Sequence, residues 1–207
     1  MQIIPAFVTQ NKCYQAGAPL TPRGIMLHSV GTPQPSAAVF ARSFNQYQPG
    51  GVSVCVHAFA QADGTVYQTL PWEMRGWHCG GSANSTHIGV EMTEPSAGMT
   101  RSEAAEQIAG TYRTVVELFA ELCKQYELDP AQDGVIIGHA EGHRRGVASH
   151  HADPELLRRM NRRGDIDKTR AFLKKARDMG FTLRTTFITG FPGETDAQFE
   201  RLMDFAR

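Results

Sequence analysis

The stretch Gly24-Ile-Met-Leu-His28 decides the fold. It is a short apolar run that ends on a histidine, and the loop at 29–35, which contains Gly and Pro, prevents its continuation. We therefore predict a buried strand with His28 at its end. The later stretch Gly134-Val-Ile-Ile-Gly-His139 repeats this pattern. The two histidines are expected to converge at one edge of a sheet.

Further elements surround these two strands. Apolar runs at 52–60 and 65–70 flank Ala62-Asp63-Gly64, and Asp-Gly between strand-like runs predicts a hairpin. Another strand is expected at 87–92. Thr100-Arg-Ser-Glu103 has the spacing of a capping box and predicts the start of a long helix. Its apolar face is expected to comprise Ile108, Tyr112, Val115, Val116, Phe119, Leu122, Cys123 and Tyr126.

The amino-acid composition limits the classes of protein to which the chain can belong. The 207 residues are 41% hydrophobic and 20% charged, which suits one full globular domain with a smaller appendage. No stretch approaches the roughly 18 consecutive apolar residues of a spanning helix, so no membrane contact is expected. The N-terminus has no basic leader, which predicts synthesis in the cytoplasm without a signal peptide. Single, scattered cysteines indicate reduced thiols, although pairing of Cys13 stays open.

The chain changes character near residue 154. Residues 1–153 contain nine basic and 13 acidic residues, a net charge of −4. Residues 154–207 contain 12 basic and eight acidic residues, a net charge of +4. All eight histidines and all four cysteines lie in the first part. We predict a domain at 1–153 and a basic extension at 154–207 with an α-β-α pattern. The zero total charge argues against a nucleic-acid partner, and the basic residues of the extension are interpreted as a solvated face.

The histidines at the strand ends indicate a metal site. Zinc binds imidazole nitrogens and carboxylates, and a catalytic site keeps a fourth position for water. His28 and His139 would supply two ligands. The third is expected among a cluster downstream of His139, where Asp153 is favoured because the loop at 146–153 can return the chain to the metal. The other candidates are His143, His150 and His151. The alternative is that the strand-end histidines are hydrogen-bonded core residues or surface groups.

An ordered set of motifs gives a resemblance. They are Gly24–Ser29, Val52–Phe59 with Ala62–Gln68, Arg75–Asn84, His87–Glu91, Gly138–His143 and His151–Pro154. In this order they resemble the zinc-dependent N-acetylmuramoyl-L-alanine amidases of phage endolysins and bacterial autolysins, which are related in fold to peptidoglycan recognition proteins. The likeness covers nearly all of residues 1–153. It implies an α/β fold in which helices pack on a central mixed sheet.

The resemblance also implies roles for individual residues. His28, His139 and Asp153 would hold zinc. Glu91 falls where some members place a catalytic glutamate, and the less favoured alternative is an exposed strand carboxylate. His151 stands where relatives often carry a lysine that stabilises the oxyanion, so the residue type departs from the family pattern. A protonated imidazole could play the same catalytic role, and the alternative is that the ring only packs.

His57, Trp77 and His78 resemble groove residues that contact sugar or peptide, and for Trp77 a role as a core anchor is an even alternative. The implied reaction is hydrolysis of the amide between N-acetylmuramic acid and L-alanine in peptidoglycan, with zinc polarising the carbonyl and activating water. The enzyme would act on the cell wall after release. A rival function is a non-catalytic peptidoglycan-binding module. No oligomeric state is predicted.

The extension has a different resemblance. Residues 156–205, with Thr186-Phe-Ile-Thr-Gly-Phe-Pro-Gly-Glu-Thr195, resemble an interior piece of the radical S-adenosylmethionine methylthiotransferases. That family binds its cluster through a C-x-x-x-C-x-x-C motif, which does not occur here. The extension is therefore interpreted as a fused fragment without radical chemistry. A fragment of an RNA- or protein-modifying enzyme is the third functional alternative.

Overall fold

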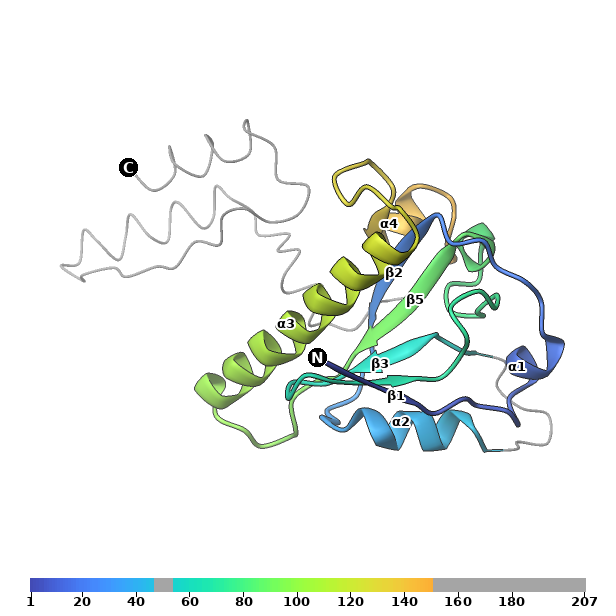
Figure 1. The fold of residues 1–207 in the computed structure, drawn as a ribbon. Coiled ribbons are helices and arrows are strands. Elements are labelled where there is room, and N and C mark those ends of the chain that lie inside the picture. Colours follow the sequence, from blue (N-terminus) through green and yellow to red (C-terminus); the bar gives the residue numbers. More distant parts are fainter. Residues whose placement is uncertain (47–53, 151–207) are drawn as a thin grey trace, which may run out of the picture. The chain divides into compact units, whose positions relative to one another are not determined.

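In the computed structural model, which describes residues 1–46 and 54–150, six strands form one sheet in the order β1-β4-β3-β5-β2-β6 (Figure 1). Neighbouring strands run parallel except for β3 and β4, which are antiparallel. The mixed sheet predicted from the sequence is therefore confirmed. The strands are β1 (Gln2–Pro5), β2 (Gly24–Ser29), β3 (Ala58–Ala60), β4 (Thr65–Gln68), β5 (His87–Met92) and β6 (Ile136–Gly138).

Four α-helices and one short 3₁₀ helix accompany the sheet in the described part of the chain. They are α1 (Lys12–Ala16), α2 (Ala37–Phe44), α3 (Arg101–Gln125), α4 (His139–Arg144) and the 3₁₀ helix η1 (Ser82–Ser85). No helix among the described residues is long and apolar enough to cross a membrane. The predicted helices and strand of the extension lie outside the described residues.

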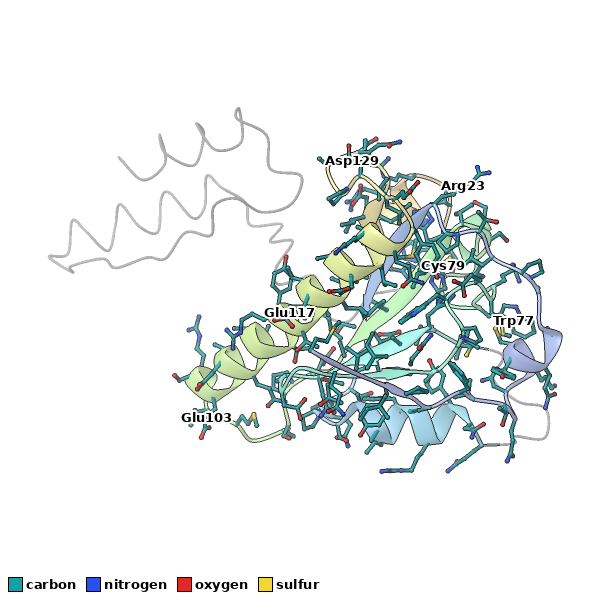
Figure 2. The ribbon with its side chains drawn as sticks, viewed as in Figure 1. Arg23, Trp77, Cys79, Glu103, Glu117 and Asp129 are labelled. Carbon is teal, nitrogen blue, oxygen red and sulfur yellow. The ribbon has the colours of Figure 1, made fainter. Side chains whose placement is uncertain are left out.

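Helix α3 begins at the predicted capping box. The Thr100 hydroxyl accepts from the backbone N–H of Glu103, and the Glu103 carboxylate accepts from the backbone N–H of Thr100. These bonds satisfy amide groups that a helix start leaves free. In Figure 2, Glu103 lies in the first turn of this long helix and Asp129 lies in the loop that follows its end.

The apolar face of α3 differs in part from the prediction. Val115, Phe119, Leu122 and Cys123 are buried as expected, but Val116 is 49% exposed. Further buried residues of α3 recur at helical spacing on the side of Val115 that is away from Val116. The buried face is therefore rotated about the helix axis relative to the predicted face. These residues are Gly110, Thr111, Thr114 and Leu118.

The two faces of the sheet have different neighbours. Side chains alternate along a strand, so Ile25 and Val90 pack with α3 on one face. On the opposite face Met26 packs near α4, and Phe59 stacks against Phe40 of α2 with ring centroids 5.3 Å apart. His28 follows Met26 by two residues and therefore lies on this second face, which α3 leaves uncovered.

The hairpin forms at the predicted position. Gly64 has a φ of +87°, which favours glycine, and the Asp63 carboxylate accepts from the backbone N–H of Thr65. Strand β3 is shorter than predicted, because Cys55 instead forms an isolated antiparallel bridge with Trp77. The expectation for residues 52 and 53 lies outside the described part.

Candidate active site

His28 and His139 meet at one edge of the sheet. His28 lies near the end of β2 and His139 directly follows β6, and these strands run parallel. The Nδ1 atoms of the two rings are 3.1 Å apart, and both residues are buried. The sequence predicted this convergence, and the parallel pairing of β2 with β6 produces it.

The second nitrogen of His139 faces a backbone carbonyl. Its Nε2 lies 3.1 Å from the Ser149 carbonyl oxygen, which can only accept, so Nε2 donates. Ser149 is held in turn by Cys79, whose carbonyl accepts from the Ser149 backbone N–H at 2.8 Å. A Cβ at Gly81 would lie 2.3 Å from the Val147 carbonyl oxygen, so glycine permits this close approach of the two loops.

The second nitrogen of His28 faces another histidine. His28 Nε2 lies 2.9 Å from His78 Nδ1, and His78 Nε2 donates to the His87 carbonyl at 3.1 Å. Burial lowers the pKa of His28 to about 3, with smaller contributions from His139 and His57. Burial also holds the pKa of His78 well below its usual value. Both rings are therefore neutral at neutral pH.

The hydrogen-bond polarity leaves two lone pairs facing each other. A neutral His78 that donates from Nε2 accepts at Nδ1, so His28 donates from Nε2 and carries a lone pair on Nδ1. In the tautomer that donates from Nε2 to Ser149, His139 likewise carries a lone pair on Nδ1. Two lone pairs 3.1 Å apart repel unless a proton or a metal ion lies between them.

This donor set fits a divalent metal. Bonds of 2.0–2.1 Å in a tetrahedral zinc site separate two ligand nitrogens by roughly 3.3 Å. The 3.1 Å between the two Nδ1 atoms is close to that separation. Each ring also donates its other N–H to an acceptor, the usual outer-shell arrangement of metal-binding histidines. His28 and His139 are therefore the residues that could hold the ion.

The third ligand is not found within residues 1–46 and 54–150, where no group of three His, Cys, Asp or Glu side chains could hold a metal. His143 and His150, two of the predicted candidates, are exposed and stack edge to face with centroids 4.8 Å apart. Neither forms a metal-binding group with His28 and His139. Asp153, the favoured candidate, and His151, the predicted oxyanion residue, lie outside the described residues.

Glu91 lies beside His28. The two residues are register partners on the neighbouring parallel strands β5 and β2, and Glu91 is half-buried. Directly paired residues project from the same face of a sheet. The carboxylate is thus on the same face of the sheet as His28, and Glu91 is the residue for which the family resemblance implies a catalytic role.

The predicted groove residues have other surroundings. His57 is fully buried, donates from Nε2 to the Met74 carbonyl at 2.8 Å and accepts at Nδ1 from the Gly89 N–H at 2.9 Å. With both nitrogens bonded to backbone, His57 is a core residue in this structure and presents no atom to a groove. Trp77 is half-buried and packs against the cluster of Cys13, Cys55, Val8 and Leu70. This suits the alternative role of a core anchor.

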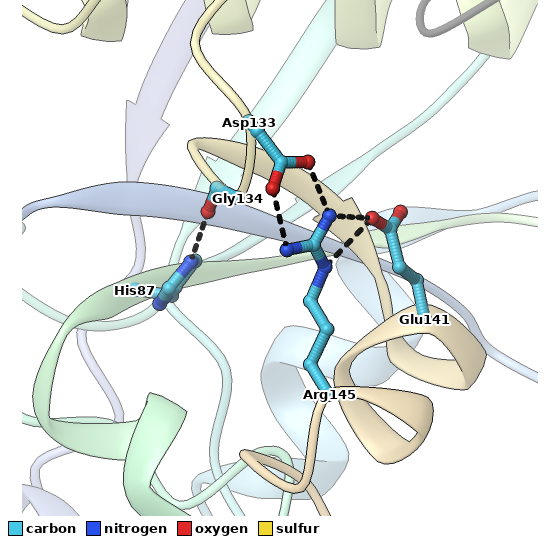
Figure 3. Close-up of polar contacts among 5 residues, drawn as sticks. All are labelled: His87, Asp133, Gly134, Glu141 and Arg145. Atoms are coloured by element: carbon cyan, nitrogen blue, oxygen red, sulfur yellow. Dashed lines mark hydrogen bonds and ion pairs between the residues drawn. The ribbon is translucent and has the colours of Figure 1, made fainter.

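A polar network supports the loop before β6 and the helix after it. Arg145 binds both Asp133 and Glu141 (Figure 3), with 3.0 Å between Arg145 Nη1 and an Asp133 oxygen. The hydrogen bonds from Arg145 hold the pKa of Asp133 below its usual value. His87 Nε2 donates to the Gly134 carbonyl in the same region. These contacts connect α4, which begins with His139, to the preceding loop.

Several supporting groups near the histidines were not predicted from the sequence. Gly89 lies under the His78 ring, and the Glu94 carboxylate accepts from Ser29 Oγ at 2.6 Å and from the Gly31 N–H at 3.0 Å. A signal for Gly89 was present, because a glycine inside a strand often marks a close approach. Backbone acceptors such as the Ser149 carbonyl leave no signal in residue type.

The fold and site define a class of protein. A mixed sheet with a histidine pair at its strand ends and a neighbouring carboxylate has the groups used in metal-assisted hydrolysis. Residues 18–156 match the family model described as N-acetylmuramoyl-L-alanine amidase. The chain belongs to this amidase family.

Solved structures show the same fold. The catalytic domain of XlyA matches with a TM-score of 0.60 and 22% identity, covering 83% of this chain and 97% of that one. Staphylococcus aureus hydrolase AmiA, solved in complex with its ligand, matches with a TM-score of 0.59 and 22% identity, covering 77% of this chain and 76% of that one. The peptidoglycan-amidase fold predicted from the sequence is confirmed.

The C-terminal part is similar to different proteins. Residues 140–206 match the radical SAM superfamily model. Ribosomal protein uS12 methylthiotransferase RimO of Hydrogenovibrio crunogenus is 54% identical over 57 residues, which are 27% of this chain and 13% of that protein. The same enzyme of Paraburkholderia phytofirmans is 45% identical over 87 residues, 38% and 19% of the two chains. This chain thus spans less than a fifth of these curated relatives, and the resemblance of the extension is confirmed.

Proposed function

We propose that this protein is a zinc-dependent N-acetylmuramoyl-L-alanine amidase that hydrolyses the amide between N-acetylmuramic acid and the L-alanine of the stem peptide. One observation carries the proposal. Nδ1 of His28 and Nδ1 of His139 face each other at 3.1 Å in a chain whose residues 18–156 match the amidase family. We assign residues 1–153 to the amidase domain and residues 154–207 to a C-terminal extension.

His28, His139 and Asp153 would hold the metal. A bound zinc ion would supply a Lewis acid for the scissile carbonyl and lower the pKa of water toward neutrality. Asp153 enters the proposal because an aspartate is a normal zinc ligand and follows His139 closely in the chain. His28 and His139 keep their orientation through the hydrogen bonds to His78 and Ser149.

Glu91 is the proposed general base and acid. Its register with His28 supports this role, because a carboxylate on the same face can take a proton from the attacking water. It would then deliver that proton to the amine of the leaving L-alanine. His151 is proposed to stabilise the oxyanion by donating a hydrogen bond. Trp77 stays a proposed substrate contact, because it is only half-buried.

We infer the place of action from the proposed substrate. Peptidoglycan surrounds the cell membrane, so an enzyme made in the cytoplasm must be released before it acts. We propose such a release, with a muramyl peptide of the wall as the partner. We propose neither a nucleic-acid partner nor a membrane partner for this protein.

The test is digestion of purified muropeptides by the full chain. The zinc-loaded protein should release new amino groups of L-alanine, and chelation should abolish this release until zinc is restored. His28→Ala and His139→Ala should be inactive and should not retain zinc. Full activity in metal-free protein would contradict the proposal. Binding to cell walls without any release of amino groups would favour the rival function of a non-catalytic wall-binding module.

A further inference from the structure

His78 contacts the ring nitrogen of His28 that does not face His139. Its Nδ1 is 2.9 Å from Nε2 of His28, the nitrogen that points away from His139. The two rings meet edge to face, with centroids 5.1 Å apart and planes at 80°. The contact therefore runs from one ring nitrogen to another and is directional.

The direction of the hydrogen bond between His28 and His78 is determined by the contact at Nε2, the other ring nitrogen of His78. The His87 carbonyl lies 3.1 Å from His78 Nε2 and can only accept, so that nitrogen carries the hydrogen. His78 then accepts at Nδ1, and His28 must donate from Nε2. A fixed backbone carbonyl thus determines which nitrogen of His28 has the lone pair.

The surroundings of His78 hold its ring in one place. A Cβ at Gly89 would lie 2.5 Å from His78 Cγ, and a Cβ at Gly76 would lie 2.9 Å from His78 Cδ2, so both positions have to be glycine for the ring to fit. The buried side chain of Asn84 accepts from the backbone N–H of His78 at 2.9 Å. Backbone, ring face and Nε2 are therefore each fixed by a different group.

We propose that His78 is a positioning residue that fixes the tautomer and the ring plane of His28, so that Nδ1 of His28 is held ready for a metal. This assignment replaces the predicted contact of His78 with substrate. The inference rests on the proposed function, because it takes zinc as the bound metal ion. Groups that orient a metal-binding histidine typically contribute 10–100-fold to metal affinity or activity.

Two substitutions distinguish the effect of the hydrogen bond on zinc affinity from the effect of ring packing. His78→Phe keeps a planar ring but removes the acceptor, whereas His78→Asn keeps an oxygen near the position of Nδ1. We expect the zinc dissociation constant of the full chain, measured by competition with a chromophoric chelator, to rise about 10–100-fold in the Phe variant. The Asn variant should recover most of the affinity. Thermal unfolding of the metal-free variants reports whether each still folds.

Gly89→Ala provides a second variant that leaves His78 chemically intact. The added methyl group would displace the ring, so this variant should also lose zinc affinity. Gly138→Ala is its matched control, because nothing lies within 4 Å of a Cβ there. It should bind zinc like the unsubstituted chain.

The outcomes distinguish this inference from the proposed function. Equal zinc affinity in the unsubstituted chain and the folded Phe variant would overturn the inference. Equal losses in the Phe and Asn variants would also overturn it, because packing alone would then explain the effect. A chain that binds no zinc at all would instead contradict the proposed function.

Discussion

His28 and Glu91 are register partners on the parallel strands β2 and β5. Adjacent strands lie about 4.8 Å apart, so the two side chains leave the same face of the sheet next to each other. A candidate metal ligand and a carboxylate are thereby fixed by backbone pairing rather than by a loop. Rigid elements of this kind hold reacting groups more precisely than loops do.

Glu91→Gln is expected to lower turnover about 10²–10⁴-fold, the usual contribution of a general acid–base group. The amide has nearly the same shape but cannot accept the proton. Zinc content should be unchanged, since Glu91 is not a proposed ligand. The measurement is the rate of amino-group release from muropeptides.

Glu106→Gln is the matched control, because Glu106 is an exposed carboxylate on α3. α3 packs on the face of the sheet opposite to His28, so this change should leave turnover unaffected. Similar rates in the Glu91 variant and its control would remove Glu91 from the mechanism.

Asp153→Ala tests the proposed third ligand. Loss of a direct ligand should weaken zinc binding by at least about 100-fold, more than the loss of most outer-shell groups. The same substitution at His143 or His150 should have little effect, because neither forms a metal-binding group with His28 and His139. Zinc affinity is measured by chelator competition. A larger loss in either histidine variant than in the aspartate variant would exclude Asp153.

Much of the fold could be predicted because local signals agreed with the tertiary structure. The capping box at Thr100 marks the start of α3, Asp63-Gly64 forms the hairpin, and β2 ends beyond His28. In each case a few neighbouring residues determine the local geometry. The convergence of His28 and His139 followed from the same pattern, because both end apolar runs.

Other features depend on contacts that a sequence pattern does not contain. β1 joins the edge of the sheet through parallel pairing with β4, far along the chain, and was not predicted. Val116 looks apolar and periodic, yet Thr111 and Thr114 are buried on α3 in its place. Their hydroxyl groups bond to carbonyl oxygens, which makes burial favourable. His57 was assigned to a groove because residue type does not reveal its two backbone partners.

Thr100→Ala should destabilise the domain without changing its chemistry. Loss of a helix N-cap costs about 1 kcal/mol, which corresponds to roughly 2–4 °C in Tm for a protein of this size. Ser102→Ala is the control, since Ser102 is exposed in the first turn of α3 and is not the cap residue. Calorimetry of the metal-free variants measures the difference. Identical melting temperatures for the two variants would show that the capping box contributes nothing.

The burial of His57 predicts loss of stability in acid. Burial lowers its pKa to about 4, although hydrogen bonds to Met74 and Gly89 act in the opposite direction. In the unfolded chain the imidazole titrates near 6.5, so between pH 6.5 and 4 the unfolded state binds more protons than the folded state. Stability is therefore complete above pH 6.5 and falls as the pH drops through this window. The difference in pKa corresponds to about 3 kcal/mol for His57.

Urea unfolding of metal-free protein between pH 7 and 5 measures this dependence. Other buried histidines add to the slope, so the informative quantity is the difference between the unsubstituted chain and His57→Gln, which cannot titrate. His57→Gln should be less stable at pH 7 but should lose less stability on acidification. Thr100→Ala serves as the control, because losing a cap should displace the curve without changing its slope in this range. Parallel curves for the unsubstituted chain and His57→Gln would mean that His57 is already charged or already exposed in the folded state.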